Sequence, residues 1–166
     1  MKVTPLPSQA RLKELLDYDP LTGGLVWRNP PANLKRMKGK SAGTFNTEGY
    51  RKICIGGRPY KAHRIIWLWQ TGVDPLDQQV DHKDQDKANN AWSNLRLATS
   101  RQNRSNRFAK SRELPKGVSV KRQRYLAQIM VNYVNHYLGT FDTPEEAHQA
   151  YCEAAVLLHG EFVCLE

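Results

Sequence analysis

The sequence predicts an α+β protein with two modules: a strand–loop–strand–helix unit near the middle of the chain and, after it, a three-stranded antiparallel sheet packed on one helix. Short alternating runs bounded by Gly, Asn and Asp predict the strands, and Ser or Thr cap signals mark the helices. The chain has 166 residues, 40% hydrophobic and 25% charged, which is typical of one ordinary globular domain or two small ones.

The N-terminal part predicts a helix, a strand, a hairpin and a second helix. Ser8 can cap a helix with leucines along one face, and Leu25–Trp27 is typical of a strand. The pair Gly56-Gly57 separates two strand-like runs, which indicates a hairpin because a tight turn needs positive φ. Residues 63–71 are apolar almost all round and stop at Gly72, so we expect a buried helix whose tryptophans pack in the core.

The middle of the chain predicts strand, loop, strand and helix in that order. A short strand carries Asp81 and His82 at its rim, and a loop rich in Asp and Asn follows. Leucines then alternate with polar residues over residues 94–98, as in a second strand. Thr99-x-x-Gln102 is a capping box, so a helix is expected to begin there with Asn103 in its first turn.

The C-terminal third predicts three strands, over residues 116–120, 124–131 and 133–141, followed by a capped helix. Thr143 is the expected N-cap, and small or apolar residues recur at helical spacing until Gly160. The sheet face away from this helix is expected to carry Lys121, Arg122, Arg124 and Gln128.

The charge of the chain is positive and unevenly distributed. The net charge is +9, but residues 140–166 hold six acids and no Lys or Arg, which leaves +15 on residues 1–139. Ten Lys or Arg and one acid lie between Leu95 and Arg124. A basic middle with an acidic end predicts one surface that contacts a polyanion and one that faces away from it.

The cysteines and the hydropathy pattern exclude other classes. Cys54, Cys152 and Cys164 include no pair at C-x-x-C spacing, so reduced thiols are expected and neither a disulfide framework nor a zinc site. The first residues lack the apolar core of a signal peptide, and no stretch approaches the roughly 20 apolar residues of a membrane span. We therefore expect a cytoplasmic protein without a membrane partner.

The polar residues of the middle unit suit hydrolysis of a phosphodiester. That reaction needs a base that deprotonates water and a cation that neutralises charge on the phosphate. A histidine is a suitable base near neutral pH, and carboxylate and carbonyl oxygens are suitable ligands for Mg²⁺. Asp81, His82 and Asn103 supply this set if the helix packs back over the two strands.

The same residues resemble the HNH, or ββα-metal, endonucleases, in particular the phage and intron-encoded branch that includes homing enzymes. In that branch an Asn follows the His by twelve residues and a second Asn follows nine later, as Asn94 and Asn103 follow His82. The resemblance implies that His82 is the general base, that Asn94 orients it, and that Asp81 and Asn103 hold one Mg²⁺ or Mn²⁺. Its motifs are Ala62-His63-Arg64-Ile65-Ile66-Trp67, Val80-Asp81-His82, Asn94-Leu95-Arg96 and Gln102-Asn103.

Other polar residues of this region leave two interpretations open. His63 opens the predicted buried helix, where a core or cap role is favoured over catalysis. Asp84 and Asp86 are close enough in sequence to reach a metal, although a solvated loop is favoured. Neighbouring phosphates are expected to be held by Arg96, Arg101, Arg104 and Arg107.

The C-terminal module resembles the Apetala or ethylene-response-factor DNA-binding domain over about residues 115–165. The likeness is carried by Lys116-Gly117-Val118, Tyr125 to Ile129, Tyr137 to Ala147, Ala150-Tyr151 and Ala154-Ala155. It implies a sheet that reads the major groove of DNA with a helix packed behind. Ser119 and Met130 stand where that family usually has Arg, which predicts looser sequence preference. By position the residues that would face DNA are Ser119, Lys121, Arg124, Tyr125 and Gln128.

Together the two resemblances imply a metal-dependent DNA endonuclease with a nuclease domain over residues 1–110 and a DNA-binding domain over residues 111–166. It would act on double-stranded DNA as a monomer or a DNA-assembled dimer, in a bacterial host cell and encoded by a phage. Two alternatives stay open: a DNA-binding regulator that kept the scaffold but does not cut, and a nuclease without sequence preference or one that acts on RNA.

Overall fold

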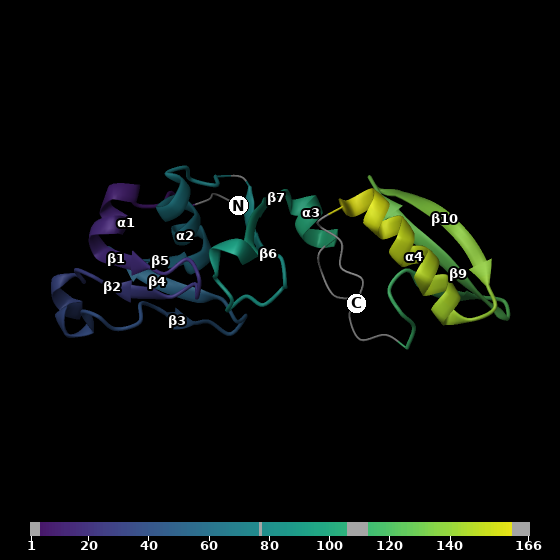
Figure 1. Ribbon diagram of the computed structural model, residues 1–166, viewed down its shortest axis with the longest axis horizontal. Coiled ribbons are helices and arrows are strands. Elements are labelled where there is room, and N and C mark those ends of the chain that lie inside the picture. Colours follow the sequence, from purple (N-terminus) through teal and green to yellow (C-terminus); the bar gives the residue numbers. More distant parts are fainter. Residues whose placement is uncertain (1–3, 77, 106–112, 161–166) are drawn as a thin grey trace. The chain divides into compact units, whose positions relative to one another are not determined.

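The computed structural model describes residues 4–76, 78–105 and 113–160. By its internal contacts the chain divides into two compact units, Met1–Ser100 and Arg101–Glu166, both built from helices and strands (Figure 1). The predicted α+β class is confirmed. The sequence pattern places the domain boundary after residue 110, ten residues later than this division, and that boundary stays a prediction.

The first unit begins with the predicted capped helix. The Arg11 N–H donates to Ser8 Oγ at 3.2 Å, at the start of α1 (Gln9–Leu15). The chain continues into β1 (Leu16–Tyr18), which pairs antiparallel with β2 (Leu25–Trp27). A 3-10 helix, η1 (Ala32–Met37), follows these strands.

A three-stranded antiparallel sheet comes next, made of β3 (Thr44–Phe45), β4 (Arg51–Ile55) and β5 (Arg58–Lys61). The last residue of β4 pairs with the first residue of β5, so the loop has only two residues. Those residues are Gly56 and Gly57, with φ of 59° and 77°. The predicted glycine hairpin is confirmed, since residues with a Cβ rarely adopt positive φ at two successive positions.

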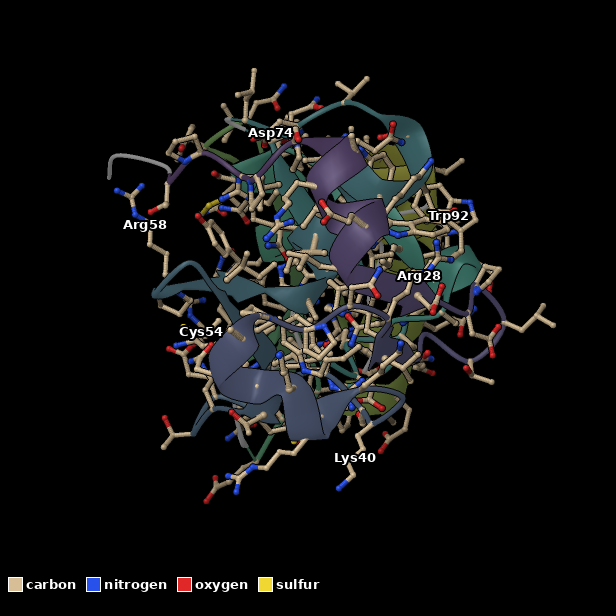
Figure 2. All side chains as sticks on the ribbon, turned by 90° about the vertical axis from the view of Figure 1, so that its left-hand side faces the viewer. Arg28, Lys40, Cys54, Arg58, Asp74 and Trp92 are labelled. Carbon is tan, nitrogen blue, oxygen red and sulfur yellow. The ribbon has the colours of Figure 1, made fainter. Side chains whose placement is uncertain are left out.

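Helix α2 (Ala62–Thr71) supplies the centre of the first unit's core and ends at Gly72, whose φ is 77°. It contacts α1, β4, β5 and β6, and α1 and α2 lie beside each other in Figure 1. Cationic side chains such as Lys40 and Arg58 project outward from this unit (Figure 2). The predicted packing role of the helix tryptophans is confirmed by ring contacts, Trp67 with Trp92 at 5.0 Å and Trp69 with Tyr18 at 5.7 Å between centroids.

The strand–loop–strand–helix order predicted for the middle of the chain is also confirmed. Strand β6 (Gln79–His82) pairs antiparallel with β7 (Leu95–Ala98), and a short 3-10 helix, η2 (Trp92–Asn94), ends the loop between them. Helix α3 (Ser100–Ser105) follows β7 directly.

The second unit contains a sheet in the order β10-β9-β8 and one long helix. Its strands are β8 (Val118–Lys121), β9 (Arg124–Val131) and β10 (Val134–Phe141), all antiparallel. Helix α4 (Pro144–His159) begins with the predicted cap, since the Glu146 N–H donates to Thr143 Oγ1 at 3.2 Å.

Helix α4 covers one face of this sheet (Figure 1). Small residues on the helix, such as Ala147 and Ala155, allow close approach, and both are fully buried. Tyr151 lies against Gly117, where a Cβ would come within 2.0 Å of the tyrosine ring. None of the helices in the described ranges combines the length and hydropathy that a bilayer crossing requires.

Candidate active site

The candidate site is built on the antiparallel pair β6 and β7. In this register Asp81 lies opposite Arg96, and His82 lies opposite Leu95. The sequence places Asp81 and His82 at the strand's rim, and the structure places them as the last two residues of β6, 7% and 3% exposed. Because both side chains are buried away from water, each needs hydrogen-bond partners within the protein.

Asp81 has its partner on the facing strand. The Arg96 guanidinium donates from Nε at 3.1 Å and from Nη2 at 3.0 Å to Asp81 Oδ2. Arg96 is itself only 7% exposed. The expectation that Arg96 contacts a DNA phosphate from the surface is therefore wrong for this structure, because the strand register directs its side chain onto a buried carboxylate.

His82 is oriented by Asn90, a loop residue that the sequence motifs do not include. His82 Nε2 lies 3.2 Å from Asn90 Oδ1, and Asn90 Nδ2 donates to the Ala88 carbonyl at 3.0 Å. The amide nitrogen is thus engaged elsewhere, so an oxygen, which can only accept, faces the imidazole. Nε2 therefore carries the hydrogen, and Nδ1 is the basic nitrogen of the neutral ring. No sequence motif pointed to Asn90. The only indication was the general rule that a buried histidine needs a hydrogen-bond partner for its second ring nitrogen.

Asn94 organises the loop rather than contacting His82. Its Oδ1 accepts from the Asp84 N–H at 3.1 Å, and its Nδ2 donates to Asp84 Oδ1 at 2.9 Å and to the Asn89 carbonyl at 2.8 Å. Its own carbonyl accepts from the Lys83 N–H at 2.9 Å. The expected hydrogen bonds across the loop are present, and any orienting effect on His82 acts through the loop that also carries Asn90.

Asp84, left open as a metal ligand or a loop residue, is held by the loop. Its carboxylate accepts from Asn94, from Asn89 at 2.6 Å and from the Asp86 N–H at 2.9 Å. Partial burial alone would raise the pKa of Asp84, but the hydrogen bonds from Asn89 and Asn94 lower it overall. These contacts favour the interpretation of Asp84 as a structural residue of the loop.

Two histidine rings meet at the site. His63, in the first turn of α2, lies with its ring 5.1 Å from that of His82 at an interplanar angle of 85°. His63 is 5% exposed, which accords with the favoured core role. Burial, and then the charges of His82, Lys61 and Arg64, hold its pKa well below 6.5.

Burial also lowers the pKa of His82. The hydrogen bond to Asn90 and the carboxylates of Asp84 and Asp81 oppose this shift without cancelling it. His82 is therefore neutral at pH 7, which is the form that can accept a proton.

The remaining expected residues of the nuclease site belong to the helix after β7 and beyond. Asn103 lies in α3 at the predicted place near its start and is half-buried. The side chains of Arg101 and Arg104, and the whole of Arg107, lie outside the described residues. The joint action of Asn103 and Asp81 on one metal stays a prediction.

The donor types fit a hard divalent cation. Asp81 supplies a carboxylate and Asn103 a side-chain carbonyl, the oxygen ligands that Mg²⁺ and Mn²⁺ prefer. One Asp81 oxygen already accepts from Arg96, so the carboxylate is held in a fixed orientation. Among the described residues no three His, Cys, Asp or Glu converge as a metal centre.

The open face of the second unit carries four of the five residues expected to contact DNA. Ser119 pairs with Leu126 and Lys121 with Arg124 in the β8–β9 register, and Gln128 follows on the same face at the strand period of two. The expected position of Tyr125 on this face is wrong. It packs on the α4 side with Val118, Ala127 and Ala147, because neighbours in a strand point to opposite faces.

The middle of the chain is similar in sequence to known proteins. The family model described as HNH endonuclease matches residues 60–105. An uncharacterized HNH endonuclease of Acanthamoeba polyphaga mimivirus is 41% identical over 102 residues, which are 60% of this chain and 54% of that protein. The chain thus spans about half the length of this curated relative. No solved structure matches the chain. The segment that matches this family model, residues 60–105, includes Asp81, His82, Asn94 and Asn103.

Proposed function

We propose that this protein is a metal-dependent DNA endonuclease in which His82 is the general base. One observation carries the proposal: a neutral histidine, held at Nε2 by Asn90 and with Nδ1 as its basic nitrogen, lies within the segment that matches the HNH family. A positioned base of this kind contributes about 10²–10⁴-fold to a rate. Nδ1 takes the proton of the attacking water while the Asn90 contact keeps the ring from turning.

Asp81 and Asn103 hold one Mg²⁺ or Mn²⁺, which neutralises charge on the phosphate and stabilises the leaving oxygen when bound. Arg96 fixes the Asp81 carboxylate by two hydrogen bonds to Oδ2. Asn94 Nδ2 donates to the Asn89 carbonyl, and this bond holds the loop so that Asn90 stays within reach of His82. The protein's contribution is thus to preorganise its base and its carboxylate before DNA arrives.

The second unit targets the enzyme to duplex DNA through the open face of its sheet. Support comes from charge: Lys121 and Arg124 lie on that face, whereas the helix behind it carries Glu145, Glu146 and Glu153. An acidic helix avoids phosphates, and a basic sheet attracts them. Arg101, Arg104 and Arg107 hold phosphates that neighbour the scissile one. The mimivirus relative is consistent with a viral or phage origin.

Supercoiled plasmid incubated with Mg²⁺ tests the cutting activity. The wild type is expected to nick or linearise it, EDTA to stop the reaction, and His82→Ala to lower the rate by about 10²-fold or more. His159→Ala, at the end of α4, is the matched control and should cut normally. Equal loss of DNA binding and cutting in His82→Ala would contradict the assigned role.

The same experiment separates the rival class, a DNA-binding regulator that does not cut. Such a protein would bind duplex DNA and leave the plasmid intact with Mg²⁺ or Mn²⁺. The presence of Asp81, His82, Asn94 and Asn103 at the family's spacing favours the nuclease. Lys121→Gln with Arg124→Gln should weaken binding without abolishing chemistry, and unchanged affinity would contradict the role of the sheet.

A further inference from the structure

Two lysines from separate segments converge on one tyrosine beside the candidate base. Lys61 Nζ lies 4.0 Å from the centroid of the Tyr50 ring, and Lys87 Nζ lies 5.0 Å from the same centroid. Lys61 ends β5, whereas Lys87 belongs to the loop between β6 and β7. Tyr50 thus joins the glycine hairpin of the first unit to the loop that orients His82.

This lysine–tyrosine cluster, defined as Tyr50, Lys61 and Lys87, adjoins the histidine pair. The Tyr50 ring lies 5.3 Å from the His63 ring and 6.2 Å from the His82 ring, centroid to centroid. Through the shared Tyr50 ring, Lys61 Nζ lies no farther than 10.2 Å and Lys87 Nζ no farther than 11.2 Å from the centre of the His82 ring.

The charge of these lysines is offset only in part nearby, by Glu48 at Lys61. In the described ranges neither lysine forms an ion pair with a carboxylate. Lys87 Nζ donates to the carbonyl of Glu48 at 2.9 Å. Burial is the main cause of the lowered pKa of Lys61. The charge of Glu48 opposes this shift, and the charges of Lys52, Lys87 and Arg64 add to it. Like charges brought together at a half-buried position are stabilised when an anion joins them.

The backbone at the same place also favours an anion. Lys61 is the N-cap residue of α2, and no side chain caps the free N–H groups of that ten-residue helix. Helix N-termini attract negative charge, which adds to the two ammonium groups. Lys61 therefore brings a cation to the end of the helix where an anion is preferred.

We propose that Lys61 and Lys87, held by the Tyr50 ring, bind a backbone phosphate of the DNA strand next to the phosphate at His82. This inference rests on the proposed function for the identity of the bound strand. It assigns the N-terminal hairpin a direct part in positioning the substrate. The site recognises the phosphodiester and not the base, because both contacts are charge contacts.

Binding without cleavage tests the site. Full-length Lys61→Gln, Lys87→Gln and the double variant are titrated with a fluorescently labelled DNA duplex in EDTA, by anisotropy, over a series of NaCl concentrations. Each lysine removed should lower the slope of log K against log salt by about 0.9 and weaken binding several-fold at low salt. Lys61→Arg with Lys87→Arg keeps the charges and should restore most of the slope.

Lys13→Gln is the matched control, because Lys13 Nζ lies 5.0 Å from the Trp69 ring and carries the same charge elsewhere on the first unit. If both glutamine variants match this control, the phosphate site is refuted, even where the wild type cuts DNA. If the wild type binds DNA but never cuts, the nuclease proposal fails. The slopes of log K against log salt still show in that case whether Lys61 and Lys87 bind a phosphate. Lys87 is exposed, so its variant provides the test should Lys61→Gln fail to fold.

Discussion

Replacement of Arg96 by Met should destabilise the first unit far more than removal of a surface cation. Arg96 donates twice to Asp81 Oδ2, and both residues are 7% exposed. The methionine would leave a buried carboxylate without its cation, and neighbouring apolar residues cannot replace those hydrogen bonds. Arg96→Met therefore tests whether strand register, rather than DNA contact, explains this arginine.

The expected loss is about 3–5 kcal/mol, the usual cost of breaking a buried ion pair at one partner. With a urea m-value of about 1.5 kcal/mol/M, a loss of about 3 kcal/mol lowers the denaturation midpoint by roughly 2 M. The double variant Asp81→Leu with Arg96→Met should recover most of this loss, because an apolar pair of similar volume removes both buried charges.

Tryptophan fluorescence is the appropriate assay. The four tryptophans, Trp27, Trp67, Trp69 and Trp92, all belong to the unit Met1–Ser100. Their emission therefore reports the unfolding of the unit that contains the ion pair, without a contribution from the other unit.

Arg28→Met supplies the matched control. Arg28 pairs with Asp17 in the same unit, but the two side chains are 52% and 45% exposed, so its removal should leave the urea midpoint nearly unchanged. A fall in the midpoint for Arg96→Met no larger than that for Arg28→Met would refute the reasoning, as would a double variant no more stable than Arg96→Met.

Two further predictions concern other parts of the chain. Gly117→Ala should destabilise the second unit by about 2 kcal/mol or more, because φ is 82° and the new Cβ would lie 2.0 Å from the Tyr151 ring. Thermal unfolding followed by circular dichroism measures this. The control is Gly160→Ala, where φ is 54° and the Cβ would meet no atom. The first unit should lose stability as the pH falls below about 6.5, because His63 then becomes protonated in the unfolded chain. In the folded state burial, and then the charges of His82, Lys61 and Arg64, lower the pKa of His63, so it stays neutral there. Urea midpoints at pH 7.5 and 5.0 measure this, and His63→Phe should reduce the difference; an unchanged difference would contradict it.

Local patterns in the sequence were sufficient for most secondary-structure elements. Side chains that satisfy their own helix, such as Ser8 and Thr143, define helix starts without help from distant residues. The glycine hairpin is equally local, because positive φ is a property of two successive residues. The spacing of His82, Asn94 and Asn103 was informative for the same reason, since a strand, a loop and a helix of fixed length separate them.

Side-chain partners across strands could not be predicted in this way. Arg96 alternates with Leu95 and Leu97 in the sequence, as an outward-facing strand residue would, and only the β6–β7 register places it on Asp81. Tyr125 and Arg124 are adjacent and so lie on opposite faces of β9; which of them faces outward depends on where α4 packs. The resemblance by position alone assigned both to one face.

The sequence by itself determined the order of elements, the spacing of His82, Asn94 and Asn103 and the division of charge between a basic middle and an acidic end, because these depend on residue type and position along the chain. Only the tertiary structure decided that Asn90 orients His82, that Arg96 holds Asp81, and that the lysine–tyrosine cluster lies beside the base. Those contacts join residues whose proximity depends on burial, strand register and loop closure, which no local pattern encodes.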